Sequence, residues 1–345
     1  MLDGCPAGLA ISEKEIQADL DRRIPRGTGV VSSRIEPDKI EILSGLLEGH
    51  TTGAPICMIV WNKDVDDAAY LDTNYKPRPG HANFTSSQRY GGYQDYRGGG
   101  IFSGRSTVSF VSAGAVARSL LRRSGIEVLA HAIEIAGVRS DSTTSLDEVR
   151  KFTYENAVRC ANLSVAGRME TAILEAAAQG DSVGGVVEGI ALSVPSGVGE
   201  PLYDSLDADL AKLLFDIPAV KGVEFGAGFE SARMKGSSSN DEYVVRSGEI
   251  ETSTNNAGGV AGGLSTGQPL IVRVAFKPTP SIAKLQKTVD LKTTKEDSIE
   301  VKGRHDPCVV PKAVPVVEAV ISIVLVDHLI RAGKIPKVLG RKDND

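Results

Sequence analysis

A long stretch without clear helical or strand periodicity, residues 62–105, interrupts a chain whose other segments are regular. A stretch of this length inside a compact protein is usually either functional or disordered. Its aromatic side chains argue against disorder, because disordered segments are poor in aromatic residues. They include Tyr70, Tyr75, Phe84, Tyr90, Tyr93 and Tyr96. We therefore expect an ordered, functional loop between regular elements.

The regular segments alternate between helical and strand-like patterns. Apolar spacing and capping residues predict helices over residues 12–23, 107–123, 167–179, 206–214 and 314–331. Continuous or alternating apolar residues predict strands over residues 54–61, 126–138, 186–194, 270–276 and 299–301. This order favours an α/β or α+β core. Since no Pro/Ser-rich linker divides the sequence, we expect one intertwined catalytic domain over residues 1–345.

The sequence also contains a weak internal echo. The segment LDGCPAGLAIS followed by DLDRRIP resembles the segment VEGIALSVPSGVGEP followed by DADLAKLLFDIP. Each pair passes through a Pro/Gly loop and a helix to an Ile-Pro dipeptide, which suggests two related halves.

Composition narrows the class of protein. The net charge of −5 argues against a general binder of nucleic acid or of membrane surfaces. The apolar run Ala319–Val326 is too short to span a bilayer and predicts a buried helix, and residues 1–15 lack the pattern of a signal peptide. The four cysteines are far apart in the sequence, which fits reduced thiols in a cytoplasmic protein better than disulfides or a zinc site.

The segment RPGHANFTSSQRYGGYQDYRGGGIFSGR, residues 78–105, combines arginines and a histidine with many glycines. Arginine offers a rigid fork of donors for carboxylates and phosphates, and glycines let backbone N–H groups approach an anion. The histidine titrates near neutral pH, so it could act as an acid or a base. A tyrosine-rich surface loop with solvated arginines is the alternative, but the density of these residues favours an anion site. They are Arg78, His81, Arg89, Arg97 and Arg105.

Four further segments have competing functional and structural interpretations. GDSVGG, residues 180–185, fits a helix end and strand entry; NNAGGVAGGLSTG, residues 255–267, fits a tight turn or a ligand loop but is no P-loop. In FKPTPS, residues 276–281, a lysine beside two hydroxyls could hold a phosphate, or the segment is a Pro-rich strand exit. In KGRHDPCVVPKAVPVVEA, residues 302–319, Asp306 could lie near a cofactor or cap a turn, and the cluster is too small for a metal site.

These segments, in their order along the chain, resemble the signature segments of the chorismate synthase family. They are GHANFT, DYRGGG, FSGR, GDSVGG, AVKGVEFG, NNAGGVAGG, FKPTPS and GRHDPCVVPKAVPVVEA, and the opening DGCPAGLAIS also fits. The resemblance covers nearly the whole chain, and the ordered set is highly specific. It implies an α+β fold, a β-α-β sandwich, usually assembled as a homotetramer with one flavin per subunit.

The resemblance also implies a reaction. The family consists of lyases that convert 5-enolpyruvylshikimate 3-phosphate to chorismate and phosphate by 1,4-elimination, in the shikimate pathway of aromatic amino-acid biosynthesis. The reaction requires reduced FMN. Since the sequence carries no appended reductase domain, the reductant is expected from outside, as NADPH or through a separate flavin reductase. The arginine cluster agrees with this reaction, because the substrate carries two carboxylates and a phosphate while the protein is acidic overall.

The family's functional residues can be carried over by position. His81 matches a catalytic histidine near the flavin and the leaving phosphate, and Asp306 matches the aspartate that relays the proton. Arg23, Arg97 and Arg105 fall where the anions of the substrate are held. Positions that contact the flavin are matched by Ser103, Pro218, Ala219, Gly262, Lys277, Pro278, Thr279, Pro280, Ser281 and Arg304.

The sequence departs from the family pattern at several positions. Most members have a GESHG segment, with a second histidine, before DGCPAG, whereas Met1 stands at that point here. Ile101, Asn83 and Asn256 stand where a basic residue, an aspartate and a histidine are usual. We expect these departures to affect flavin affinity and rate rather than the fold. The alternative function is that of a non-catalytic paralogue or fragment that binds flavin or anions without turnover.

Overall fold

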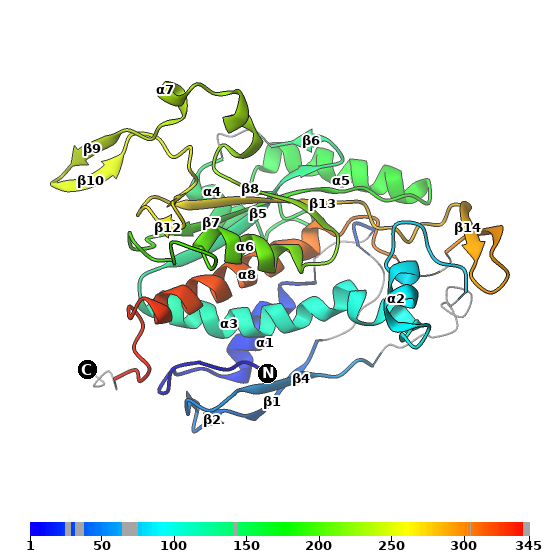
Figure 1. Ribbon diagram of the computed structural model, residues 1–345, viewed down its shortest axis with the longest axis horizontal. Coiled ribbons are helices and arrows are strands. Elements are labelled where there is room, and N and C mark those ends of the chain that lie inside the picture. Colours follow the sequence, from blue (N-terminus) through cyan, green and yellow to red (C-terminus); the bar gives the residue numbers. More distant parts are fainter. Residues whose placement is uncertain are drawn as a thin grey trace.

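The computed structural model describes residues 1–24, 29–31, 38–63, 75–140, 144–301, 303 and 305–340. Two long helices, α3 (Val108–Arg123) and α8 (Val310–Arg331), pack against each other through its middle (Figure 1). They approach so closely that a Cβ on Gly114 would lie 2.3 Å from the Cβ of Ala319, so α3 requires a glycine there.

Helix α8 is the core helix that the apolar run predicts. By length and composition it could cross a membrane, but 83% of its apolar window is buried inside the protein. Apolar residues occupy all sides of it, as expected of a helix surrounded by other elements. Pro311 falls in its first turn, where proline is tolerated, whereas Pro315 lies inside the helix and removes one backbone hydrogen bond.

An antiparallel five-stranded sheet covers one side of these helices (Figure 1). Its strand order is β6-β5-β7-β13-β8. The inner strand β13 buries alternate residues along its length, and helix α8 contacts both β5 and β7. The period of two therefore directs one face of the sheet onto the helices. The strand bounds are Glu127–Ile135 (β5), Val138–Arg139 (β6), Gly185–Leu192 (β7), Val220–Phe225 (β8) and Leu270–Phe276 (β13).

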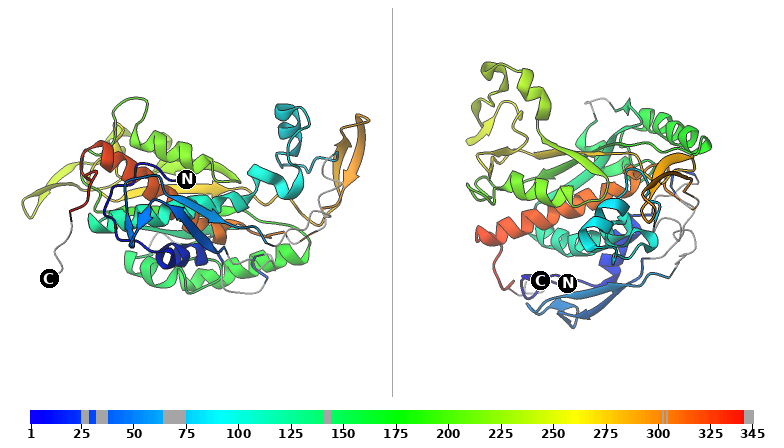
Figure 2. Two further views of the ribbon diagram at one scale, coloured as in Figure 1. Left: turned by 90° about the horizontal axis from the view of Figure 1, so that it is seen from below. Right: turned by 45° about the vertical axis from the view of Figure 1, so that its right-hand side comes forward.

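A smaller antiparallel pair, β1 (Ile40–Ser44) and β4 (Cys57–Val60), lies on the opposite side of the helices (Figures 1 and 2). Helix α1 (Glu13–Asp21) contacts both α3 and β1. It begins at Ser12, whose side chain forms a capping box with Glu15. With helices between two β layers, the fold is the predicted α+β arrangement, a β-α-β sandwich.

The helices of the weak internal echo occupy comparable positions. Helix α1 packs on α3, and helix α6 (Leu206–Phe215) packs on α8, its partner in the central pair. Helices α4 (Leu146–Phe152) and α5 (Leu163–Ala178) both contact strand β5 of the main sheet.

The remaining elements are short and mostly peripheral. One group is a set of hairpins: β2 (Leu46–Leu47) with β3 (His50–Thr51), β9 (Tyr243–Arg246) with β10 (Glu249–Thr252), β11 (Val260–Ala261) with β12 (Leu264–Ser265), and β14 (Gln286–Asp290) with β15 (Lys295–Ile299). The others are helices: α2 (Asn83–Tyr90), α7 (Gly236–Ser239) and the 3-10 segments η3 (Arg97–Phe102), η4 (Gly104–Thr107) and η5 (Gly228–Arg233).

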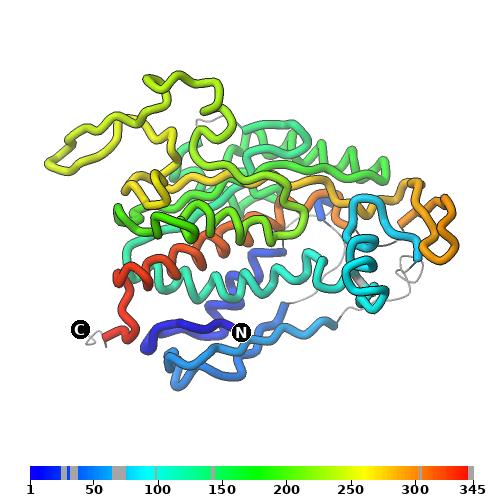
Figure 3. The backbone as a smooth tube through the Cα atoms, viewed as in Figure 1, coloured from blue at the N-terminus to red at the C-terminus, as the bar shows by residue number. Residues whose placement is uncertain are grey.

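Most predicted elements are confirmed, with two corrections. The stretch 62–105 is less irregular than its sequence indicates, because it contains α2, η3 and η4; short helices in glycine-rich sequence give no periodic apolar signal. The strand predicted over 299–301 instead spans Lys295–Ile299, where charged residues obscure the strand pattern of an exposed hairpin. The first and last described segments also run together, since Ala7 N–H donates to Lys337 O at 3.1 Å (Figure 3).

Candidate active site

Four sequence segments that are far apart along the chain meet at one end of the main sheet. Arg78 Nη1 donates to Ser281 Oγ at 3.0 Å, which joins the 78–105 segment to FKPTPS. Ser182 Oγ donates to Thr279 O at 2.7 Å, and Val183 N–H donates to Pro307 O at 2.8 Å. These contacts join GDSVGG to FKPTPS and to the segment around Asp306. In Figures 1 and 2, α2 lies beside the β14–β15 hairpin at this end.

Arg78 organises the histidine of this site. Its side chain is only 4% exposed, and its Nε donates to Asn83 Oδ1 at 3.0 Å. Its Nη2 lies 3.1 Å from His81 Nε2 and 3.3 Å from His81 Nδ1. Burial and the neighbouring Arg78 and Lys277 cations lower the pKa of His81 to about 4, so the imidazole is neutral at pH 7.

The glycines of this segment permit close packing around His81. A Cβ on Gly99 would lie 3.2 Å from His81 Nε2, and Gly99 has a φ of +89°, which side chains rarely adopt. Gly80, with a φ of +72°, lies beside Pro280 and Lys277. Its carbonyl accepts a hydrogen bond from Lys277 Nζ. The backbone of the 78–105 segment therefore wraps directly over FKPTPS.

The FKPTPS segment presents polar groups towards this cluster. It follows strand β13, and Lys277 N–H donates to Ala219 O at 2.9 Å, which places the Pro218–Ala219 turn alongside. Burial and Lys221 lower the pKa of Lys277. The Thr279 hydroxyl is buried and has no hydrogen-bond partner among the described residues. A buried hydroxyl in that state is suited to a bound ligand.

Arg23 and Arg105 meet at the carboxylate of Asp38, which no sequence motif marks. Both guanidinium groups donate to the Asp38 carboxylate, which is 5% exposed. Arg23 also donates to Thr107 Oγ1 at 3.1 Å. Burial, followed by the repulsion of Arg105, lowers the pKa of Arg23 to about 10, against the opposing pull of Asp306. The two arginines and Asp306 therefore share one electrostatic environment.

The carboxylate of Asp306 is held in place by Lys312. Lys312 Nζ donates to the two carboxylate oxygens of Asp306 at 2.7 and 3.0 Å. The carboxylate remains 22% exposed. Lys312 lies in the first turn of α8, so the core helix fixes the position of this ion pair.

The other predicted site residues are distributed unevenly. Ser103 caps η4 through its Oγ, which accepts from Arg105 N–H at 3.2 Å. Arg97 is 56% exposed and pairs with Asp95, so no described contact brings it to Arg23 and Arg105. Gly262 lies in the β11–β12 turn before β13, about 20 Å along the sheet from FKPTPS. Arg304 lies outside the described residues.

The glycine-rich segments GDSVGG and NNAGGVAGGLSTG also have backbone roles. In GDSVGG, Gly180 ends helix α5 with a φ of +66°, and Asp181 pairs with Lys284 at 2.6 Å. In NNAGGVAGGLSTG, a Cβ on Gly258 would lie 2.2 Å from Gly226 N. Both segments therefore show the tight turns of their structural interpretations.

Sequence reasoning missed several residues of the cluster. Asp38, Ser182 and Lys312 each contact a predicted site residue. Ser182 and Lys312 lie inside two of the quoted segments but were not selected there, and Asp38 lies in none of them. Asp38 is the clearest case, because a lone aspartate between helix α1 and strand β1 has no distinguishing neighbours in sequence. Its partners come from two segments that only the fold brings together.

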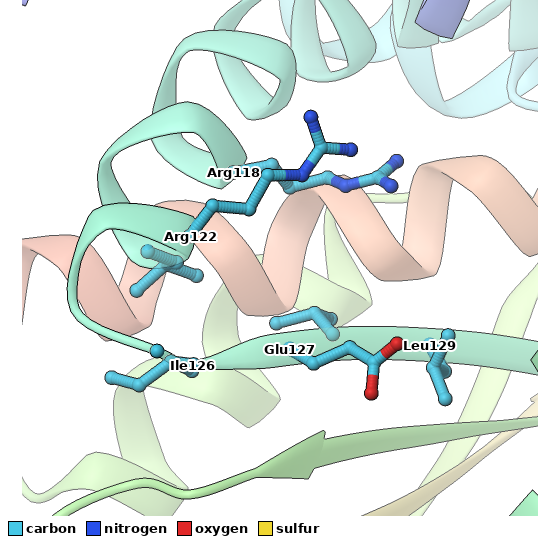
Figure 4. A pocket seen from close by; sticks show the side chains of 8 residues that line it. Arg118, Arg122, Ile126, Glu127 and Leu129 are labelled. Carbon is cyan, nitrogen blue, oxygen red and sulfur yellow. The ribbon is translucent and has the colours of Figure 1, made fainter.

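A surface cavity of about 320 Å³ lies away from this cluster (Figure 4). It is lined by the C-terminal part of α3 and the start of β5, including Arg118, Arg122 and Glu127. The cluster adjoins the opposite end of α3, about 24 Å away along the helix. The cavity has none of the predicted site residues in its lining, so we place the candidate site at the polar cluster instead.

Comparison with known proteins decides the family. The family model described as chorismate synthase matches residues 1–330. A chorismate synthase of Korarchaeum cryptofilum is 53% identical over 96% of this chain and 92% of its own length. Another, of Dehalococcoides mccartyi, is 50% identical over 98% and 93%. The chain belongs to the chorismate synthase family.

A solved structure agrees at the level of the fold. A chorismate synthase crystal structure superposes with a TM-score of 0.74 and 30% identity, covering 96% of this chain and 86% of that one. Chorismate synthases are lyases that form chorismate in the shikimate pathway, and the activity of this chain is that of its family. The comparisons do not favour the non-catalytic alternative. Membership also implies a small-molecule substrate and a reduced flavin cofactor.

Proposed function

We propose that this chain converts 5-enolpyruvylshikimate 3-phosphate to chorismate and phosphate at the cluster of His81, Lys277, Asp306, Arg23 and Arg105, with reduced FMN as its flavin. The observation that carries the proposal is the convergence of the 78–105, FKPTPS and Asp306 segments around a neutral, partly buried histidine. Arginines and a lysine from separate segments face a trianionic substrate there, which matches its two carboxylates and phosphate.

The residues of the cluster fit a bound flavin and a phosphate. The unpartnered Thr279 hydroxyl can donate to an oxygen acceptor, and Lys277 and Ser281 flank it in FKPTPS. The turn at Ala219, which accepts from Lys277 N–H, supplies backbone beside them. We assign FMN to this surface, with Ser103, Pro218 and the remaining FKPTPS residues as further contacts. When bound, reduced FMN supplies electron density to the substrate ring and a basic nitrogen for the departing ring proton.

His81 is suited to handle the proton of the leaving phosphate. Without an anion, Arg78 and Lys277 help to keep its imidazole neutral. A phosphate bound beside these cations would offset their field, raise the pKa of His81 and let the imidazole donate a proton as the phosphate departs. The same cations would stabilise the negative charge that develops on the leaving group.

Asp306 is suited to relay onward the proton lost from the substrate ring. Its carboxylate is part-exposed and held in place by Lys312 on α8. Arg23 and Arg105 would bind the carboxylates of the substrate on the neighbouring side, with Asp38 bridging and orienting the two guanidinium groups. We place Arg97 at the rim, where it would guide the anionic substrate.

Several wider features follow from the family and join the proposal. We propose a single catalytic domain, which the continuous apolar core from Cys5 to Ile335 supports. We further propose a cytoplasmic homotetramer, in which Gly262 would contact the flavin of a neighbouring subunit rather than its own. Reduced flavin would come from NADPH through a separate reductase.

Flavin titration tests the shared site. We expect oxidised FMN to bind modestly alone and at least tenfold more tightly with substrate present, because flavin and substrate share one pocket. Absorbance titrations with and without substrate measure the two affinities, and anaerobic chorismate formation with photoreduced FMN measures turnover. Equal FMN affinity in both titrations would contradict the shared site.

A further inference from the structure

The end of helix α1 holds two adjacent arginines with different partners. Arg23 reaches Asp38 and Thr107 in the candidate site. Arg22 turns the other way, towards the interior of the protein, where its Nη2 lies 2.7 Å from Glu318 of α8. The direction of Arg23 therefore depends on how the backbone is held as it leaves α1.

Arg159 holds that backbone on both sides of Arg23. Its Nη2 donates to Arg22 O at 3.2 Å and to Ile24 O at 3.3 Å. The carbonyls of the residues before and after Arg23 thus share one guanidinium group. Both bonds come from one nitrogen, whose two N–H groups can each donate to one carbonyl.

Arg159 is itself fixed from several directions. It is 3% exposed, its Nη1 donates to Tyr154 O at 3.2 Å, and its guanidinium lies 4.6 Å from the centre of the Tyr154 ring. Its φ of +61° is rare for a residue other than glycine, so its surroundings determine this conformation. The carbonyl of Arg159 also accepts from Ala132 N–H in β5 at 2.9 Å, which ties it to the main sheet.

The partners of Arg22 complete the support. The Arg22 guanidinium lies 3.9 Å from the centre of the same Tyr154 ring and 3.3 Å from Asp19. Tyr154 is thus stacked between Arg22 and Arg159, and its hydroxyl is buried. The Arg22 side chain and the backbone after α1 are therefore both held by the interior of the protein. The Arg23 side chain faces the candidate site.

We propose that Arg159 is a positioning residue for substrate binding, which acts by fixing the backbone around Arg23. This inference rests on the proposed role of Arg23 in holding a substrate carboxylate. It extends the functional set to the segment between α4 and α5, where the sequence gives no functional signal. Arg159 touches neither substrate nor cofactor in this proposal.

Arg159→Met and Arg159→Lys test the proposal. We expect Arg159→Met to raise the substrate Kd and KM about tenfold through the loss of charged hydrogen bonds, with kcat within about threefold of the original. Arg159→Lys should recover part of this loss. Arg150→Met is the matched control, because Arg150 is 40% exposed and pairs with Glu127 and Asp147 on the surface. The control should leave the substrate Kd unchanged.

A double-mutant cycle separates positioning from general destabilisation. In the Arg23→Ala background, Arg159→Met should raise the substrate Kd by less than about twofold, because its effect passes through Arg23. Additive effects of the two substitutions would overturn the inference and leave the proposed function standing. An unchanged Kd in Arg23→Ala alone would overturn both. If Arg159→Met does not fold, the same cycle with Arg159→Lys decides, since its smaller effect must also vanish without Arg23.

Discussion

Two charged clusters in this protein differ in whether their charges are balanced. Around Glu318, which is 1% exposed, Arg22 and Arg118 meet Glu318 and Asp19, and these carboxylates raise the pKa of Arg22. Around His81, burial and the cations Arg78 and Lys277 lower the pKa of the imidazole to about 4. In the first cluster the arginines are balanced by carboxylates. In the second cluster the charged neighbours of His81 are cations, so the local electrostatic field is positive.

This difference in charge balance distinguishes a cluster that stabilises the fold from one that can bind a ligand. A buried group with matched charges stabilises one arrangement of helices and has little to offer a ligand. A pocket whose neighbours disfavour a cation is prepared for an anion, since a bound phosphate would relieve that repulsion. The helices α1, α3 and α8 carry the first cluster, whereas loops at the end of the sheet carry most of the second.

Replacing His81 should produce the largest effect on activity. We expect His81→Ala to lower kcat by about 10²–10⁴-fold, the usual contribution of a positioned acid or base, with little change in urea stability. Anaerobic chorismate formation under reduced FMN measures the rate. His50→Ala is the control, because His50 is an exposed histidine in strand β3. A loss of less than tenfold in His81→Ala would mean that His81 has a structural role rather than a catalytic one.

Breaking the compensated cluster should instead affect stability. Glu318→Ala leaves Arg22 and Arg118 without their buried carboxylate and Ala130 N–H without its acceptor. We expect the free energy of unfolding to fall by about 3 kcal/mol or more. Urea denaturation of Glu318→Ala beside Glu230→Ala checks this. Glu230 is 66% exposed, and its ion pair among the described residues is with Arg233 across one helix turn, so its removal should cost less than about 1 kcal/mol.

The arginines of the site should differ according to their burial. We expect Arg105→Ala to raise the substrate Kd about tenfold to a hundredfold, since a charged hydrogen bond is worth ~1.5–3 kcal/mol. Arg97→Ala should raise it less than tenfold, because Arg97 is 56% exposed and bound to Asp95. Titration with oxidised FMN present gives both constants. Equal effects at the two positions would mean that Arg97 moves into the site when substrate binds.

The smallest expected effect is a shift in the titration of His81. Its pKa of about 4 in the free protein should rise by about one unit or more when inorganic phosphate binds, as NMR of the imidazole would report. Because the folded pKa lies below the unfolded value of 6.5, the unfolded chain binds the proton first. Stability should therefore fall as the pH drops from about 6.5 to about 4, less so in His81→Gln. An unshifted pKa with phosphate bound would place the phosphate elsewhere.

The elements with strong local patterns were predictable from sequence. The capping box at Ser12, the alternation in Leu270–Phe276 and the apolar run in Val310–Arg331 all produced the expected elements. The exposed hairpins and helix α2 were not predicted, because their apolar residues do not form a continuous face. Within the site, His81, Lys277 and Arg105 stood out by residue type in glycine-rich surroundings.

By itself the sequence determined which residues are candidates for chemistry and which strongly patterned segments form helices and strands, because those properties depend on residue type and local spacing. Tertiary structure decided their partners. Asp38 between Arg23 and Arg105, Arg78 beside Ser281, and Arg159 behind Arg23 are contacts between residues distant in the sequence. The pKa of His81 depends on burial and on the distance to two cations, and these quantities exist only once the chain has folded.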